Sequence, residues 1–313
     1  MSAASASSPS PFLLGLALTA EPGLSPDEFV RLVRRAEAAR VDFVTVEDDP
    51  GRLDSTLLLA LAARETSRIG LVPLGPVLGQ PAGYAARFAT LDLLSGGRAG
   101  VRPRIAADDV EHERIVRAIG TPEGDALVAE LFARADEFIG RVGDAWDVSG
   151  TAPQGRPPLL SLAHDTVPYR FAARHADAVL ITPFDVQGVR RIRAEVDALA
   201  AEAGRTVKVL ADLHVLLAPT DAEAAERRSE LGEFESDADL FTGTPEGLAG
   251  RLEEWHRDGG ADGFRIRPVT VPDDVYALVD RAVPLLVRRG LLPETYGTRT
   301  LRGHLGLSRE VAA

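Results

Sequence analysis

Four arginines occupy alternate positions in two short stretches of this sequence. Arg102 and Arg104 lie in "VRPRIA", and Arg265 and Arg267 lie in "FRIRP". Alternate residues of a β-strand project from one face, so each pair shares a side of its strand if these stretches are extended. A guanidinium group binds phosphate or carboxylate through paired hydrogen bonds, and an unpaired buried one is costly. The spacing therefore predicts either an anion site or ion pairs with carboxylates of the surrounding helices.

Three acidic residues follow one another at the end of another apolar stretch. Glu47, Asp48 and Asp49 come directly after "FVTV" and precede Pro50-Gly51. Residues at strand ends often face a ligand, and Asp48 is the candidate for a catalytic carboxylate. The alternative is a solvated acidic turn. These carboxylates would also neutralise part of the arginine charge in the absence of a ligand.

A histidine ends a further apolar run, "LLSLAH". His164 is placed to act as a general acid–base catalyst or to bind a phosphate group. Asp165 and Thr166 follow it, and the alternative is that one of them simply caps the next helix. His164 and Asp48 are therefore the two catalytic candidates.

The remaining histidines give no metal-site pattern. His112 in "EHERIV" lacks the second histidine of an H-E-x-x-H zinc motif, because Val116 stands there. The others are expected on helix surfaces or in the C-terminal tail: His175, His214, His256 and His304. The sequence also contains no cysteine. We therefore predict no metal site.

The composition is that of an ordinary globular protein. Of 313 residues, 45% are hydrophobic and 26% are charged, and the formal net charge is −12. An acidic chain without a Lys/Arg run is a poor nucleic-acid binder. The apolar run "FLLGLALTA" is too short to span a membrane, and no basic leader precedes it, so a cytoplasmic location is expected. We expect residues 1–11 to form a flexible arm and residues 12–313 a single domain.

Strand-like runs alternate with helical stretches along this domain. The expected strands are residues 12–18, 43–47, 69–78, 99–105, 159–163, 178–182, 207–218 and 263–267. Ser25, Pro26 and Glu28 form a capping box that starts one helix, and Thr220 and Thr244 start two others. Eight strands alternating with helices predict an α/β fold, a (β/α)8 TIM barrel, with a helical insertion between strands four and five. An open doubly wound sheet is the alternative, although no G-x-G-x-x-G follows the first strand.

Several longer stretches resemble one protein family over nearly the whole chain. They are "RIGLVPLGPVLGQP", "RFATLDLLSGGRAG", "APQGRPPLLSLAH", "FTGTPEGLAGRLEEWHRDGGADGF" and "VPLLVRRGLLPETYGTRTLRGHLGL". They resemble the bacterial-luciferase-like flavin monooxygenases, in particular the branch containing nitrilotriacetate and dibenzothiophene-sulfone monooxygenases. In "LSGGRAG" the two glycines suit the sharp end of a helix, because glycine adopts positive φ without penalty.

The resemblance implies a luciferase-like barrel and a cofactor. Members of this family use reduced FMN, supplied by a separate flavin reductase, and O2 to oxygenate a small organic substrate; some relatives use a deazaflavin. The protein would supply binding, orientation and exclusion of water. A homodimer is compatible with this family.

Several positions differ from the family pattern. Leu93 stands where the family has a histidine, and Arg102 stands where it has an asparagine. In the phosphate loop, His164 and Tyr169 stand where the family has glycines. Thr166 keeps a hydroxyl group at the position of the family's serine. A side chain at Tyr169 should obstruct the approach of backbone amides to a phosphate. We therefore expect Thr166, Tyr169 and the four arginines to form the cofactor site, with the arginines replacing the glycine loop. The alternative function is a catalytically silent barrel that serves as a partner subunit or ligand binder.

Overall fold

The computed structural model describes residues 12–19, 24–47, 53–77, 79–105, 124–146 and 153–308. The predicted flexible arm, Asp48, Asp49 and His112 lie outside these residues. No helix within the described part of the chain is long and apolar enough to cross a membrane.

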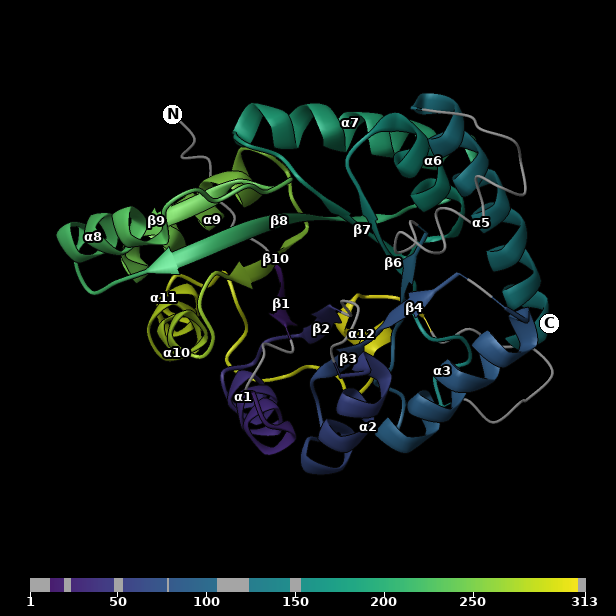
Figure 1. Cartoon of the computed structure of the whole chain (residues 1–313), viewed down its shortest axis with the longest axis horizontal. Coiled ribbons are helices and arrows are strands. Elements are labelled where there is room, and N and C mark those ends of the chain that lie inside the picture. The colour runs from purple at the N-terminus through teal and green to yellow at the C-terminus, as the bar shows by residue number, and fades with distance from the viewer. Residues whose placement is uncertain are drawn as a thin grey trace, which may run out of the picture.

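Parallel strands form a curled sheet with helices around it (Figure 1). The strands are β1 (Leu13–Thr19), β2 (Phe43–Glu47), β3 (Gly70–Val72), β4 (Leu74–Pro76), β5 (Arg102–Arg104), β6 (Leu160–Ala163), β7 (Ala178–Ile181), β8 (Lys208–Leu217), β9 (Leu240–Gly243) and β10 (Gly263–Pro268). The main sheet has the order β3-β2-β1-β10-β8-β7-β6, and every pair in it is parallel. This is an α/β architecture of the TIM-barrel type.

The third and fourth predicted strands are interrupted. The expected strand at 69–78 is split into β3 and β4 at Pro73, which has no amide hydrogen to donate. A separate two-stranded sheet pairs β4 with β5. Isolated parallel bridges join Leu71 to Ala99 and Val101 to Leu159, so residues 99–101 lie between the edge strands β3 and β6.

One strand was missing from the sequence prediction. β9 pairs in parallel with the second half of β8, with His214 opposite Leu240, outside the main strand order. Three of its four residues are only half-buried and it leads directly into the next helix, so "LFTG" shows no apolar run of the kind that marks the other strands.

The helices other than α12 lie on the outer side of the sheet (Figure 1). The helices are α1 (Pro26–Ala38), α2 (Ser55–Glu65), α3 (Pro81–Ser95), α5 (Asp125–Trp146), α6 (Thr166–His175), α7 (Val186–Glu202), α8 (Asp221–Leu231), α9 (Pro245–Arg257), α10 (Asp273–Ala277), the π-helical turn η1 (Leu278–Ala282), α11 (Val283–Arg288) and α12 (Leu301–His304). The Ser25–Glu28 capping box starts α1, and Thr220 and Thr244 cap α8 and α9, as predicted. Gly96 ends α3 with φ of 69°, the left-handed conformation that favours glycine. Helix α5 lies in the expected insertion between the fourth and fifth predicted strands and packs on α3 and α6.

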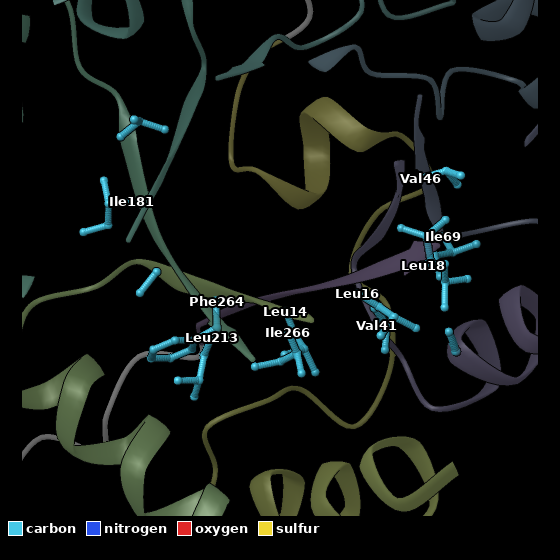
Figure 2. Close-up of a cluster of buried hydrophobic side chains, with 14 of the residues drawn as sticks. Leu14, Leu16, Leu18, Val41, Val46, Ile69, Ile181, Leu213, Phe264 and Ile266 are labelled. Atoms are coloured by element: carbon cyan, nitrogen blue, oxygen red, sulfur yellow. The ribbon is translucent and has the colours of Figure 1, made fainter. Parts of the chain in front are cut away.

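Alternation along the strands divides the core into two parts. Leu14, Leu16, Leu213, Phe264 and Ile266 belong to the larger buried cluster that packs beneath the helices (Figure 2). A smaller cluster fills the interior at the amino-terminal ends of the strands; it contains Phe43, Val72, Leu160, Ala178, Leu180, Leu210, Leu301 and Leu305. Its last two members come from α12 and the residue after it, so the C-terminal tail closes that end. The opposite, carboxyl-terminal end carries ionisable side chains.

Candidate active site

A fully buried arginine lies between two strands at the centre of the sheet. Arg265 on β10 stands opposite Asp212 on β8, and its Nε donates to Asp212 Oδ1 at 2.9 Å while Nη2 bonds Oδ2 of the same carboxylate. Its Nη1 donates to Glu47 Oε1 at 3.0 Å and contacts Thr45 Oγ1 at 3.4 Å. This bidentate arrangement fixes the guanidinium plane and engages four of the five N–H donors of Arg265.

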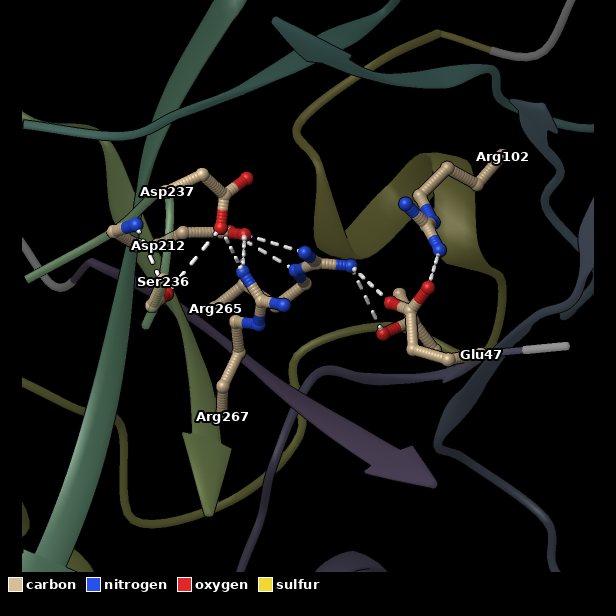
Figure 3. A network of polar contacts seen from close by, with 9 residues as sticks. Glu47, Arg102, Asp212, Ser236, Asp237, Arg265 and Arg267 are labelled. Carbon is tan, nitrogen blue, oxygen red and sulfur yellow. Dashed lines mark hydrogen bonds and ion pairs between the residues drawn. The ribbon is translucent and has the colours of Figure 1, made fainter. Parts of the chain in front are cut away.

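Two further arginines extend this network in opposite directions (Figure 3). Arg102 from β5 donates through Nη2 to the second oxygen of Glu47, which therefore bridges β5 and β10. Arg267 lies 3.8 Å from Asp212 and donates to Asp237 Oδ1 at 2.9 Å. Three guanidinium groups thus meet three carboxylates, and the network is neutral as a whole.

The ion pairs shift the acidity of the carboxyl groups involved. Burial by itself would raise the pKa of Glu47, but Arg102 and Arg265 outweigh it and hold that pKa below its usual range. Arg267 has the same effect on Asp237 and lowers its pKa despite partial burial. Both carboxylates are therefore ionised at neutral pH.

Arg265 and Arg267 lie on one face of β10, as their alternate spacing predicted, and both contact Asp212. The partners of the three arginines differ from the helix carboxylates that the sequence suggested. Glu47 was expected to neutralise arginine charge; Asp212 and Asp237 were not, and Asp212 is carried by a strand rather than by the helices. The sequence signal for Asp212 was its spacing from His214 in "VLADLHVLL". These two residues are two positions apart in an apolar strand, so both project from the same face. Arg104 ends β5 opposite Pro76 and is partly exposed.

His214 was expected on a helix surface or in the tail, and that expectation was wrong. It lies within β8, opposite Arg267, and its ring packs edge-on against Phe234 with centroids 5.0 Å apart. Both ring nitrogens are buried and make no hydrogen bond to a described residue. Burial, reinforced by the charge of Arg267, lowers the pKa of His214 to about 4, so the ring is neutral at pH 7.

The loop expected to hold a phosphate lines a pocket of about 510 Å³ between α6 and α7. His164 is exposed at this pocket, and Tyr169 lies buried in its wall. Asp165 is the N-cap of α6, and its side chain accepts a hydrogen bond from the amide of Thr166 at 2.6 Å. Asp165 therefore caps the helix, which was one of the two roles that the sequence allowed. The Thr166 hydroxyl donates to Glu195 Oε1 at 2.6 Å.

These contacts do not fit a phosphate group at this loop. The amide at the start of α6 is occupied by the carboxylate of Asp165, and Asp185 caps α7 through the amide of Gly188 at 2.6 Å. A phosphate would meet those negative charges at close range. The region around Arg102 and His214 is better suited to a hydrogen-bonding ring than this loop is to a phosphate. Arg102 Nε and both nitrogens of His214 are buried without a hydrogen bond to any residue of the described ranges.

The described residues contain no group of three or more histidine, aspartate or glutamate side chains arranged to hold a metal ion. The site therefore consists of an ion-pair network at the centre of the sheet and an acidic pocket beside it. Asp237 belongs to both, since it accepts from Arg267 and lines the pocket.

A curled parallel sheet with ionisable groups towards the carboxyl ends of its strands is the arrangement of TIM-barrel enzymes. The sequence matches the luciferase-like monooxygenase family over residues 10–262, and the chain belongs to this family.

Two curated relatives and two solved structures illustrate the similarity. One of the subunits of pristinamycin IIA synthase of Streptomyces pristinaespiralis is 28% identical, over 93% of this chain and 87% of the relative. Nitrilotriacetate monooxygenase component A of Aminobacter aminovorans is 24% identical, over 90% of each. An EDTA monooxygenase from Chelativorans sp. BNC1 has the same fold, with a TM-score of 0.82, 21% identity and coverage of 97% and 100%. The FMN complex of the oxygenating constituent of 3,6-diketocamphane monooxygenase from Pseudomonas putida has a TM-score of 0.70, 16% identity and coverage of 91% and 100%.

Proposed function

We propose that this protein is a flavin-dependent monooxygenase that uses reduced FMN and O2 to oxygenate a small organic substrate. The observation that carries the proposal is the charged network at the carboxyl ends of the strands in a chain that belongs to the luciferase-like family. The relatives give no support to a catalytically silent barrel.

The site requires a continuous wall of strands, and we infer a closed barrel in which residues 99–104 fill the gap between β3 and β6. Backbone hydrogen bonds support this: Leu71 N donates to Arg98 O at 2.8 Å, and Val101 N donates to Pro158 O at 2.9 Å. Residues 12–313 then form one domain around one axis.

The residues at the barrel end would bind and orient the cofactor. When bound, the flavin supplies the chemistry that activates oxygen. Arg102 and His214 have unused guanidinium and ring nitrogens for its polar edge. Arg265 acts as a positioning residue, because it holds Glu47 and through it Arg102.

The phosphate group would be held away from the α6 loop. Arg104 and Arg267 lie towards the carboxyl ends of β5 and β10 and can offer charge-assisted hydrogen bonds there. Thr166 and Tyr169, predicted to contact the cofactor, would then lie outside the cofactor site. His164 is exposed at the pocket and would exchange a proton with solvent.

The names of the relatives support a second protein component. One relative is a subunit of a synthase, and the other is one component of a monooxygenase. We therefore propose that a separate reductase supplies the reduced flavin.

An anaerobic titration with photoreduced FMN tests the proposal. We expect saturable binding, followed by rapid flavin oxidation when oxygen is admitted. Arg102→Gln should weaken binding by about tenfold, because it removes one charge-assisted interaction. Arg141→Gln, on the exposed face of α5, is the matched control and should leave binding unchanged. Absence of a spectral change with FMN, and with a deazaflavin in a parallel titration, would rule out the flavin site.

A further inference from the structure

We propose that the pocket between α6 and α7 binds a small organic cation with a flat apolar body. The pocket is lined by side chains of the β6–α6 and β7–α7 loops, by α7, and by Asp237. Its volume of about 510 Å³ falls within the range typical of small-molecule sites. Binding of the cation does not depend on the flavin.

The charges around the pocket are mostly negative. Four carboxylates line it, and Asp237 is already balanced by Arg267. Asp165, Asp185 and Glu195 then face the single guanidinium group of Arg191.

These three carboxylates retain acceptor capacity. Asp165 accepts from one amide, Asp185 accepts from the amide of Gly188, and Glu195 accepts from the hydroxyl of Thr166. Each of these bonds engages a single oxygen, and an ionised carboxylate has about four acceptor positions. An ammonium group can therefore be bound without breaking either helix cap.

A tyrosine hydroxyl also faces the pocket. Tyr169 lines the pocket and is only 4% exposed as a residue, and its hydroxyl makes no hydrogen bond to any residue within the described ranges. This hydroxyl is not one of the buried polar atoms without a partner, so it is open to the pocket and can bond a ligand there. Burial raises the pKa of Tyr169 to about 12, and the nearby negative charges of Glu195 and Asp165 add to this effect. The hydroxyl thus remains protonated, in a negative field, with an oxygen available to accept a hydrogen bond.

An exposed aromatic ring completes the pocket. Phe184 lines it and is 63% exposed, which is unusual for a large apolar side chain. Its ring offers a face for a flat apolar group, and aromatic faces also attract cations. A phosphate or carboxylate would gain nothing from this wall and would be repelled by the three carboxylates.

Benzylamine, benzyl alcohol and benzoate have the same ring and differ in charge, so we choose them as probes. Each would be titrated into the flavin-free protein and followed by saturation-transfer NMR and calorimetry. We expect benzylamine to bind at least about tenfold more tightly than benzyl alcohol, because a charge-assisted hydrogen bond is worth more than a neutral one. Benzoate should not bind.

Variants locate the binding to this pocket. Glu195→Gln should weaken benzylamine binding by about tenfold, and Tyr169→Phe by about three- to tenfold. Asp185→Asn preserves the helix cap and removes one charge, so it should also weaken binding without unfolding α7. Glu202→Gln, exposed at the end of the same helix, is the charge-matched control.

Equal affinity for benzylamine and benzyl alcohol would overturn the proposal. Binding of inorganic phosphate that Glu195→Gln strengthens would also overturn it, because the pocket would then be an anion site. Since no flavin is present, these results are separate from the reduced-FMN titration, and either proposal can fail while the other stands.

Discussion

Asp212 is the main carboxylate that stabilises the buried charge of Arg265. Both side chains are fully buried, and the carboxylate accepts two of the guanidinium hydrogen bonds. Burying a paired charge contributes little net stability, whereas removing one partner leaves a charge in a poorly solvated place. The two groups are therefore expected to respond very differently to single and double replacement.

We expect Asp212→Ala to lower the free energy of unfolding by about 3–5 kcal/mol, because it removes the bidentate partner of the buried Arg265 and leaves only Glu47 to balance that charge. The double variant Asp212→Leu with Arg265→Met should recover most of this loss, since neither charge remains. Urea unfolding measures both. Asp237→Ala is the comparison: its side chain is 39% exposed, and its removal should cost about 1 kcal/mol or less. Equal losses at the two aspartates would contradict the assignment of Asp212 as the main partner.

His214 should make stability depend on pH. Its folded pKa of about 4 lies below the value of about 6.5 expected in an unfolded chain. The unfolded chain therefore takes up the proton first, and stability that is present above about pH 6.5 is lost as the pH falls towards 4. Burial contributes most to the lowered pKa of His214; the charges of Arg267 and Arg265 lower it further, and Asp237 raises it.

The test compares Tm at about pH 7 and about pH 5 in the parent protein and in His214→Gln. The parent should lose more Tm than the variant over this interval. Burial raises the pKa values of Asp42 and Asp92 to about 7 and about 6. Both groups titrate in the parent and in the variant, so their effect on Tm cancels when the two proteins are compared. His164→Gln, on the exposed pocket rim, should follow the parent. Parallel Tm curves for the parent and His214→Gln would show that the ring is solvated.

At the scale of elements, the motifs that resemble the family contact one another. Gln154 of "APQG" donates to Asp92 Oδ1 and to Ala99 O, both at 2.6 Å, and accepts from Arg302 N at 3.0 Å. These partners belong to α3, to "GGRAG" and to α12. Arg98 of the same motif donates to backbone carbonyls of Ser95, Ala63, Thr66 and Ile69 and to the Thr66 hydroxyl. The motifs join helices at the amino-terminal end of the strands and are structural.

Gln154→Ala should lower the free energy of unfolding by about 3 kcal/mol, because buried partners on three elements lose their hydrogen bonds. Gln187→Ala, at an exposed position of α7, is the matched control and should change stability little. Denaturant unfolding measures the difference. If the two substitutions had the same effect, the contact between these motifs would not stabilise the fold.

At the scale of the whole molecule, the sheet is uneven in strength. β10 lies between β1 and β8 in long parallel ladders, whereas the segment between β3 and β6 is held by isolated bridges and by the short β4–β5 ladder. Pro73, Pro103 and Pro158 lie along this seam, and proline cannot donate to a ladder. Local opening should therefore begin there.

Hydrogen-exchange mass spectrometry tests this expectation. Amides of β1, β8 and β10 should exchange only on global unfolding, while those of residues 99–104 should exchange faster. Saturating reduced flavin should slow exchange in residues 99–104 if Arg102 binds it. Uniform protection of all the strands would show that the seam is as stable as the centre.

The sequence by itself determined which elements form and the family to which the chain belongs. Local signals sufficed: the Ser25 capping box, the left-handed Gly96, and apolar runs with period two each depend on a few neighbouring residues. The interruption at Pro73 and the four-residue β9 were missed because they depend on pairing with distant strands.

Only the tertiary structure decided how the site residues pair. Glu47, Arg102, Asp212 and Arg265 are far apart in the sequence, and they meet because the parallel register brings their strands together. The sequence indicated that Arg265 needs an anionic partner but not which one. The acidic pocket likewise depends on α7, which brings Glu195 against the α6 loop. Such contacts depend on how close two elements lie in the folded protein. The residue pattern along one strand or helix does not predict that separation.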